Sequence, residues 1–156
     1  MRPFEKIVDE HGAMVMRVCR AMLGAADADD AWSETFLAAM RAYPDLRPDS
    51  NIRGWLVTIA RRKAIDQKRR LKRERPVDDL AETPTWDRHR SGDVRLRAAV
   101  QALPPKQQGA VIYHYLADLP YAQVGDLIGC STAAARRSAS DGIAALRTTY
   151  PREETT

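Results

Sequence analysis

The side chains of this sequence best suited to binding chemistry are cations, and they are concentrated in one short stretch. Residues 51–75 carry ten Lys and Arg against two Asp and Glu, whereas the whole chain of 156 residues has a formal net charge of +4. Lys and Arg that are fixed on a folded surface attract phosphate groups, and each neutralised phosphate adds salt-sensitive affinity. A cationic run is also common on a solvated helix face, so its meaning depends on what holds it. The candidate phosphate contacts are Arg61, Arg62, Lys68 and Arg69.

An apolar stripe precedes these cations. Ile52, Trp55, Leu56 and Ile59 recur at helical spacing, which predicts a helix anchored on a folded bundle. We expect Trp55, and Trp32 on an earlier helix, to lie in the core. An anchored helix points its cations in defined directions, and a fixed cationic face suits a nucleic-acid backbone.

A second set of binding residues follows a glycine near the C-terminus. Residues 121–128 read as a short helix, Gly129 as a tight turn, and Ser131 as the cap of a last helix that runs to about Arg147. This outline is that of a helix-turn-helix, in which the second helix lies in the major groove of DNA. The side chains offered there are those of Ser131, Thr132, Arg136, Arg137, Ser138 and Ser140. Two packed helices of an ordinary bundle remain the alternative for this stretch taken alone.

Catalytic and metal-binding patterns are missing from the sequence. His11, His89 and His114 are scattered, and no nucleophile elbow, phosphate-binding glycine loop or metal-ligand cluster occurs. Cys19 and Cys130 form no CxxC pair and are expected to be buried, reduced thiols. We therefore expect no enzymatic activity, no cofactor and no metal site.

The elements that must position these residues are all helical. A first helix spans about 4–23 and stops at Gly24, and a second, capped by Asp27, carries an apolar stripe of Trp32, Phe36, Met40 and Tyr43. These two helices and the helix over 52–73 predict one small bundle.

A second bundle follows a segment that is rich in acidic residues and proline. Its helices are expected over 94–102, from Pro105 through a stripe of Val111, Ile112, Tyr115 and Leu116, and over the helix-turn-helix. The predicted fold class is therefore all-α, with two small helical domains joined by a flexible linker. The predicted boundaries are 1–74 for the first domain, 75–93 for the linker, 94–150 for the second domain and 151–156 for a tail. No apolar run approaches the ~20 residues that span a bilayer, and no secretory signal opens the chain, so we expect no membrane association and a cytoplasmic location.

Three segments resemble a known family when they are taken in order. "DADDAWSETFLAAMRAY", "NIRGWLVTIARRKAIDQKRR" and "ALPPKQQGAVIYHYLADLPYAQVGDLIGCSTAAARRS" are similar to the core-binding, promoter −10 and promoter −35 segments of bacterial RNA polymerase sigma factors of the extracytoplasmic-function group, in the sigma-70 family. The resemblance implies a protein that binds core RNA polymerase and directs promoter-specific transcription initiation. The implied partners are the clamp coiled coil of the largest subunit, the flap region and promoter DNA, and an anti-sigma factor that the sequence does not identify.

The resemblance also assigns residues. The helix that docks on the clamp is matched by Asp30, Ser33, Glu34, Leu37 and Arg41. The loop that captures an unpaired −10 base is matched by Arg47, Asp49, Ser50 and Asn51. The adjoining −10 helix is matched by Arg53, Arg61, Arg62, Asp66 and Arg69, and the −35 helix carries the residues from Ser131 to Ser140 named above.

Several positions depart from the family pattern. Arg62 stands where Asn is frequent, and Pro120 replaces a Ser or Thr cap. Ala139, Ser140 and Asp141 replace larger or basic residues in the last helix, where Gly142 also costs ~1 kcal/mol of helix propensity relative to Ala. These departures leave open that the second domain serves mainly to bind a protein. A helix-turn-helix transcriptional regulator that does not bind polymerase is the other alternative, although it leaves residues 30–41 and 51–73 without a role.

Overall fold

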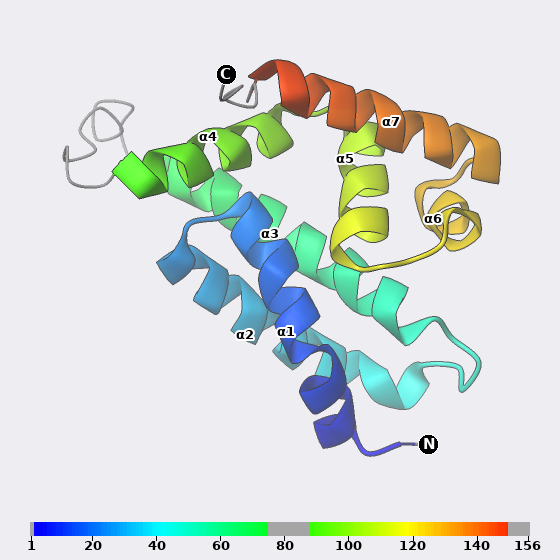
Figure 1. Cartoon of the computed structure of the whole chain (residues 1–156). Helices are drawn as coiled ribbons and strands as arrows, with labels where there is room; N and C mark the ends of the chain where they lie inside the picture. Colours follow the sequence, from blue (N-terminus) through cyan, green and yellow to red (C-terminus); the bar gives the residue numbers. More distant parts are fainter. Residues whose placement is uncertain (1, 75–87, 150–156) are drawn as a thin grey trace. The chain divides into compact units, whose positions relative to one another are not determined.

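The computed structural model describes residues 2–74 and 88–149, and every regular element in these ranges is a helix or helical turn (Figure 1). The predicted all-α class is confirmed. The chain divides into two compact units, Met1–Pro76 and Val77–Thr156. Residues 75–87 of the predicted linker and the predicted tail, 151–156, lie outside the described residues.

The first unit is a bundle of three helices in which each helix packs on the other two. They are α1 (Phe4–Met22), α2 (Ala25–Ala42) and α3 (Ile52–Glu74), and a 3-10 turn, η1 (Tyr43–Asp45), follows α2. Ile7, Val15 and Val18 of α1 meet Leu56 and Val57 of α3 in a core from which solvent is excluded. The predicted bundle is therefore present, and the hydrophobic effect of these side chains holds it together.

The start of α2 differs from the prediction. The helix begins at Ala25 with Gly24 at the N-cap and no side-chain cap bond, so the assignment of Asp27 as the cap is wrong. Leu23 and Gly24 are both extended, which lets the chain turn in two residues and begin the next helix earlier. Asp27 lies in the first turn, where its carboxylate still favours the positive end of the helix dipole.

The buried faces of α2 and α3 are rotated from those predicted. In α3 the inward residues are Leu56, Val57, Ala60, Ala64 and Gln67, whereas Ile52, Trp55 and Ile59 are half-buried. In α2 the inward stripe passes through Ala39, which leaves Met40 half-exposed rather than in the core. Alanine occupies several of the inward positions, so the helices pack closely there, and the tryptophans and Met40 lie at the rim of the interface. Trp32 is also half-buried, and its indole N–H donates to the Gly12 carbonyl at 2.9 Å.

The second unit contains α4 (Arg88–Ala102), α5 (Pro105–Val111), a π-helical turn η4 (Ile112–Leu116), α6 (Tyr121–Ile128) and α7 (Thr132–Thr149). Helix α4 starts at Arg88, earlier than the predicted start at Val94. Pro104 and Pro105 occupy the N-cap and first turn of α5, as expected from their fixed φ. The wider π turn changes the phase of the apolar stripe, so that Tyr113 is buried and Tyr115 is exposed.

The predicted helix-turn-helix is present in α6 and α7. Gly129 ends α6 with φ of 77°, a left-handed conformation that glycine adopts without strain. A Cβ at Gly125 would stand 2.7 Å from the Cys130 carbonyl oxygen, so the turn depends on this glycine as well. Ser131 caps α7 as predicted, since its Oγ accepts the Ala134 N–H at 3.1 Å. Pro120 offers α6 no side-chain cap, and its carbonyl accepts the backbone N–H groups of Gln123 and Val124 instead.

The small residues of α7 have a packing role that the sequence did not reveal. Ala135, Ala139 and Gly142 are buried, and they face the neighbouring helices of the unit. A Cβ at Gly142 would stand 2.7 Å from Val111 Cγ2 and 3.3 Å from the Gln107 carbonyl oxygen. Ala139 and Gly142 thus let α5 and α7 approach closely, and the helix propensity lost at Gly142 is offset by this packing.

Gly142→Ala is expected to lower the stability of the second unit even though alanine is the better helix former. Overpacking against the stiff Val111 side chain costs about 1–3 kcal/mol, which exceeds the gain in propensity of ~1 kcal/mol. Thermal unfolding followed by circular dichroism measures the effect. Gly12→Ala is the matched control, because its Cβ would make an ordinary contact of 3.5 Å with Trp32. A Gly142→Ala protein as stable as Gly12→Ala would refute the close-packing explanation.

Candidate polymerase and nucleic-acid interface

The exposed face of α2 brings together all five residues predicted to dock on the polymerase. They recur every three or four positions on the side of the helix opposite the buried Ala31, Thr35 and Ala39. Leu37 is 49% exposed and Met40 is 50% exposed, so two large apolar side chains stand on an otherwise polar surface. The residues of this α2 face are Asp30, Ser33, Glu34, Leu37, Met40 and Arg41. The sequence did not indicate that Met40 belongs to this surface, because a methionine at helical spacing is indistinguishable from a core residue.

An acidic groove runs beside this face between α2 and α3. Its α2 side is lined by Asp27, Asp30, Ser33 and Glu34, and its α3 side by Gln67, Arg70, Leu71 and Glu74. Arg70 pairs with Glu34 at 3.2 Å, and Gln67 Nε2 donates to the Asp27 carbonyl at 2.9 Å. Carboxylates outnumber the single arginine in the groove. The part of the α2 face beside the groove therefore favours cationic side chains of a partner.

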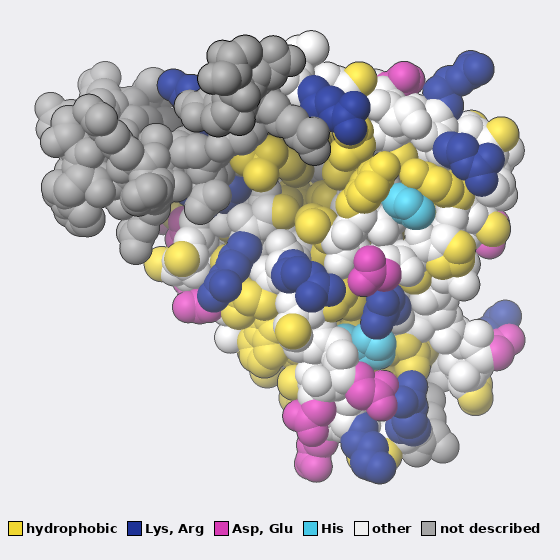
Figure 2. Space-filling view, in the orientation of Figure 1, with side chains coloured by type: hydrophobic (Ala, Val, Ile, Leu, Met, Phe, Trp, Pro, Cys, Tyr) yellow, Lys and Arg dark blue, Asp and Glu magenta, His cyan; other side chains and the backbone are white. Residues whose placement is uncertain are grey.

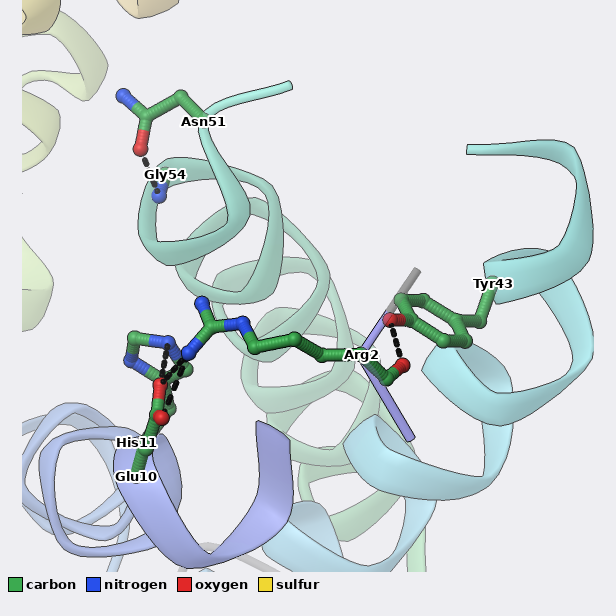
Figure 3. A network of polar contacts seen from close by, with 6 residues as sticks. All are labelled: Arg2, Glu10, His11, Tyr43, Asn51 and Gly54. Carbon is green, nitrogen blue, oxygen red and sulfur yellow. Dashed lines mark hydrogen bonds and ion pairs between the residues drawn. The ribbon is translucent and has the colours of Figure 1, made fainter. Parts of the chain in front are cut away.

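The loop before α3 is held at its first end by contacts with the N-terminal residues (Figure 3). The Tyr43 hydroxyl donates to the Arg2 carbonyl. The Arg2 guanidinium in turn donates to both carboxylate oxygens of Glu10, at 2.6 and 2.7 Å. These bonds tie η1 to α1, and so they fix the point from which the loop departs.

The other end of the loop is fixed by Asn51. Its Oδ1 accepts the Gly54 N–H at 3.0 Å, which is the geometry of an N-cap on α3 (Figure 3). Within the loop the Ser50 N–H donates to the Arg47 carbonyl at 3.0 Å, and the side chains of Arg47 and Asp49 are exposed. The four predicted loop residues therefore lie together on one short turn, and one of them also starts the next helix.

His11, which follows Glu10 on α1, is buried, at 8% exposed. Burial lowers its pKa below the ordinary value, the positive charge of Arg53 lowers it further, and Glu10 opposes both. A histidine whose pKa is lowered by folding binds more protons when unfolded. It therefore favours the folded state above its ordinary pKa, and this contribution falls as the pH drops below that value.

The cations of α3 occupy two environments. Arg62, Asp66 and Arg69 are exposed and follow one another at spacings of four and three, so they share a stripe of the helix. Arg53 and Arg61 are half-buried. The pKa of Lys68 is lowered by partial burial and by repulsion from Lys72. The predicted phosphate-binding surface is therefore centred on Arg62 and Arg69, with a carboxylate between them.

The first turns of α7 carry the other predicted DNA contacts. Ser131, Thr132, Arg136, Arg137 and Ser140 are exposed, and Ser138 is half-buried. Arg137 also lines a groove with Lys106 of α5, Cys130 and Asp141. Lys106 was missed because it precedes the helix-turn-helix in sequence and meets it only in the fold. Figure 2 shows Lys and Arg side chains, in dark blue, standing on a surface where hydrophobic side chains are also exposed.

The cysteines differ in environment. Cys19 is buried, and burial raises its pKa to about 12, as expected for an inert thiol. Cys130 is half-buried at the edge of the α7 groove, so the prediction of burial is wrong for this residue. Across residues 2–74 and 88–149, no three His, Cys, Asp or Glu side chains are grouped so as to hold a metal ion. No helix in the same ranges is long and apolar enough to cross a membrane.

Comparison with known proteins accounts for both units. The model of sigma-70 region 2 matches residues 7–74, and the model of sigma-70 region 4 matches residues 93–146. The RNA polymerase sigma factor CarQ of Myxococcus xanthus is 30% identical, over 92% of this chain and 87% of that protein. The chain belongs to the sigma-70 family.

Other relatives narrow the group. The sigma factor is 30% identical to the ECF RNA polymerase sigma factor SigC of Mycobacterium tuberculosis, over 83% of this chain and 73% of the relative. It is 27% identical to the ECF sigma factor SigE of Mycolicibacterium smegmatis, over 94% of this chain, and it spans 61% of that relative's length. The sigma factor thus has relatives in the extracytoplasmic-function group, as the sequence motifs indicated.

Solved structures confirm the fold of the sigma factor. CnrH in complex with the cytosolic domain of CnrY matches 93% of this chain and 85% of CnrH with a TM-score of 0.70 at 23% identity. RpoE in complex with the anti-sigma factor NepR from Bartonella quintana matches 96% of this chain and 98% of RpoE with a TM-score of 0.69 at 18% identity. A helix-turn-helix regulator outside this family is not favoured, because region 2 accounts for α1, α2 and α3.

Two substitutions at Asn51 test its capping role. Asn51→Ala removes the acceptor for the Gly54 N–H and is expected to lower the free energy of unfolding by about 1 kcal/mol. Asn51→Ser keeps a capping oxygen but lacks the amide, so it is expected to retain stability. Chemical denaturation measures both variants. Equal stability of Asn51→Ala and wild type would show that the cap bond is dispensable.

Proposed function

We propose that the sigma factor binds core RNA polymerase through the α2 face and that its two units contact separate promoter elements. Leu37 and Met40 give the main support, because they are exposed on a helix whose opposite face already packs in the bundle. Large apolar side chains that remain half-exposed beside charged residues are typical of a surface that a partner covers. The first unit, residues 1–74, then corresponds to core and −10 binding, and the second, 94–150, to −35 binding.

The α2 face suits the clamp coiled coil of the largest polymerase subunit. Leu37 and Met40 supply apolar area whose burial contributes about 25 cal/mol per Å². Glu34 and Arg41 carry opposite charges on the same face, and they fix the register of a charged helix pair. The acidic groove beside Asp30 extends this surface toward cationic partner groups. Binding of the flap region by the second unit follows from the family and completes the attachment.

The loop and α3 suit the −10 element. Arg47, Asp49, Ser50 and Asn51 lie on a turn whose two ends are held, so a flipped base meets a preformed site rather than one that must be ordered. Unpairing a base costs a few kcal/mol, which binding energy at such a site must offset. The helix that follows contributes Arg62 and Arg69 to the DNA backbone, with Arg53, Arg61 and Asp66 beside them.

Helix α7 suits the −35 element. Its inward face packs on α5, which leaves Arg136, Arg137 and the hydroxyls of Ser131, Thr132, Ser138 and Ser140 for DNA. An arginine in the major groove can donate two hydrogen bonds to guanine, a contact worth about 1–3 kcal/mol of discrimination. The capped N-terminus of α7 also favours a phosphate oxygen.

An anti-sigma factor is a further proposed partner. Two structures that share this fold hold a second protein, the cytosolic domain of CnrY in one and the anti-sigma factor NepR in the other. Such a partner regulates a sigma factor by competing for surfaces that polymerase or DNA needs. We place the protein in the cytoplasm, where core polymerase acts.

The α2 face predicts a defect in polymerase binding that is independent of DNA. Burying the exposed half of Leu37 is worth roughly 1 kcal/mol, so Leu37→Ser is expected to raise the Kd for core polymerase about fivefold. Titration of labelled full-length protein with core polymerase measures it. Leu96→Ser is the matched control, because Leu96 is similarly exposed at 42% but lies on α4. Equal affinity of Leu37→Ser and wild type would remove α2 from the interface.

The exposed stripe of α3 predicts a change in salt dependence. Arg62→Ala and Arg69→Ala are each expected to reduce the slope of log K against log salt by about one, because each loses one phosphate contact. Holoenzyme binding to promoter DNA at several salt concentrations gives the slope. Asp66→Ala tests the same stripe with the opposite charge, and its slope should not fall. If the arginine variants keep the wild-type slope, the stripe does not contact phosphate.

A further inference from the structure

One arginine of α7 lies against a cluster of aromatic rings. His114 and Tyr115 come from η4, Tyr121 from the first turn of α6, and Arg136 from α7. The His114 and Tyr121 rings are stacked, with centroids 3.8 Å apart and planes inclined by 13°. The Arg136 guanidinium carbon lies over the Tyr121 ring, 5.3 Å from its centroid. Three elements that are separate in sequence thus meet at a candidate DNA contact.

The ring under Arg136 is held in place. His114 Nδ1 lies 2.9 Å from the Leu119 carbonyl oxygen, so the tautomer that donates from Nδ1 fixes the imidazole plane. Tyr115 packs edge-on against His114, at a centroid distance of 4.8 Å and an angle of 87°. Tyr121 therefore stacks on an imidazole that is itself anchored at two points, and its own orientation is restricted.

A fixed ring restricts Arg136 without using up its donors. An arginine that stacks on an aromatic face keeps its N–H groups in the guanidinium plane, where they remain available to a base edge or a phosphate. An unrestricted arginine loses rotamer freedom when it binds, and this loss reduces its affinity. Arg137, the next residue on α7, turns instead into the groove with Lys106 and Asp141.

We propose that Tyr121, held by His114 and Tyr115, is a positioning residue that orients Arg136 for recognition of the upstream promoter element. This inference rests on the proposed function of α7. The contribution of Tyr121 passes entirely through Arg136, so removing the ring has no further effect once the arginine is absent.

The experiment measures how holoenzyme, formed from the full-length protein and core polymerase, selects among promoters with a randomised upstream element. The variants are Tyr121→Leu, Tyr121→Phe, Arg136→Ala and the double variant Tyr121→Leu with Arg136→Ala. A cation over an aromatic ring at an exposed site is worth about 0.5–1 kcal/mol, so Tyr121→Leu should lose about two- to fivefold in preference. The loss should fall at the positions that Arg136→Ala alters. Tyr121→Phe keeps the ring and should retain the preference, and the double variant should match Arg136→Ala.

Any other result overturns the inference and identifies the step that fails. If Arg136→Ala changes the preference and Tyr121→Leu does not, the ring does not position the arginine, while the proposed function of α7 stands. If the double variant is worse than Arg136→Ala, Tyr121 acts by a separate route. Equal losses in Tyr121→Phe and Tyr121→Leu would assign the effect to the hydroxyl.

If Arg136→Ala keeps the wild-type preference, the assignment of base recognition to Arg136 fails together with the inference. Arg147→Ala is the matched control and should keep the wild-type preference, because it removes an exposed arginine from the last turn of the same helix, outside the proposed DNA contacts.

Discussion

Close packing through small side chains is the constraint on which both units depend. In α7, Ala135, Ala139 and Gly142 bring the helix against its neighbours, and in α3 Ala60 and Ala64 do the same. A helix that is seated by small residues needs only a narrow stripe for the core. The remaining positions are then available for partners, which is how helices of ordinary length serve both the core and an interface.

Packing through small residues explains why the sequence predicted the positions of the helices better than their buried faces. The paired prolines before α5, Gly129 and Ser131 mark where helices start and stop, and the structure agrees with each, although α2 and α4 start earlier than predicted. The rotation of a helix is less visible, because alanine carries almost no periodic signal while tryptophan and methionine carry a strong one. Trp55 and Met40 were therefore placed in the core, although the neighbouring Leu56 and Ala39 occupy it. The π turn at residues 112–116 hid the exposure of Tyr115 for a related reason, since one wider turn shifts every position after it.

The candidate site was predictable to the extent that each surface lies on one element. The α2 face follows from one helical period, and the residues assigned to it are on its exposed side. Lys106 beside Arg137, and the stack of His114, Tyr121 and Arg136, each combine residues from different helices. Residue spacing along the chain does not indicate such contacts between helices, because they depend on tertiary packing. Asn51 shows a further limit, since a residue assigned to a binding loop also has a structural bond that sequence alone does not separate from recognition.

The contrast between the two cysteines gives the molecule a natural attachment point for a reporter group. Thiol reagents attack the thiolate, and Cys19, with a pKa of about 12 inside the bundle, supplies almost none at neutral pH. Cys130 is partly accessible and lines the groove of Lys106 and Arg137. A maleimide fluorophore would therefore attach at Cys130 in the native protein, without any engineered cysteine. Its emission would respond to changes of solvent at the start of α7, and so it would follow the engagement of the second unit in real time.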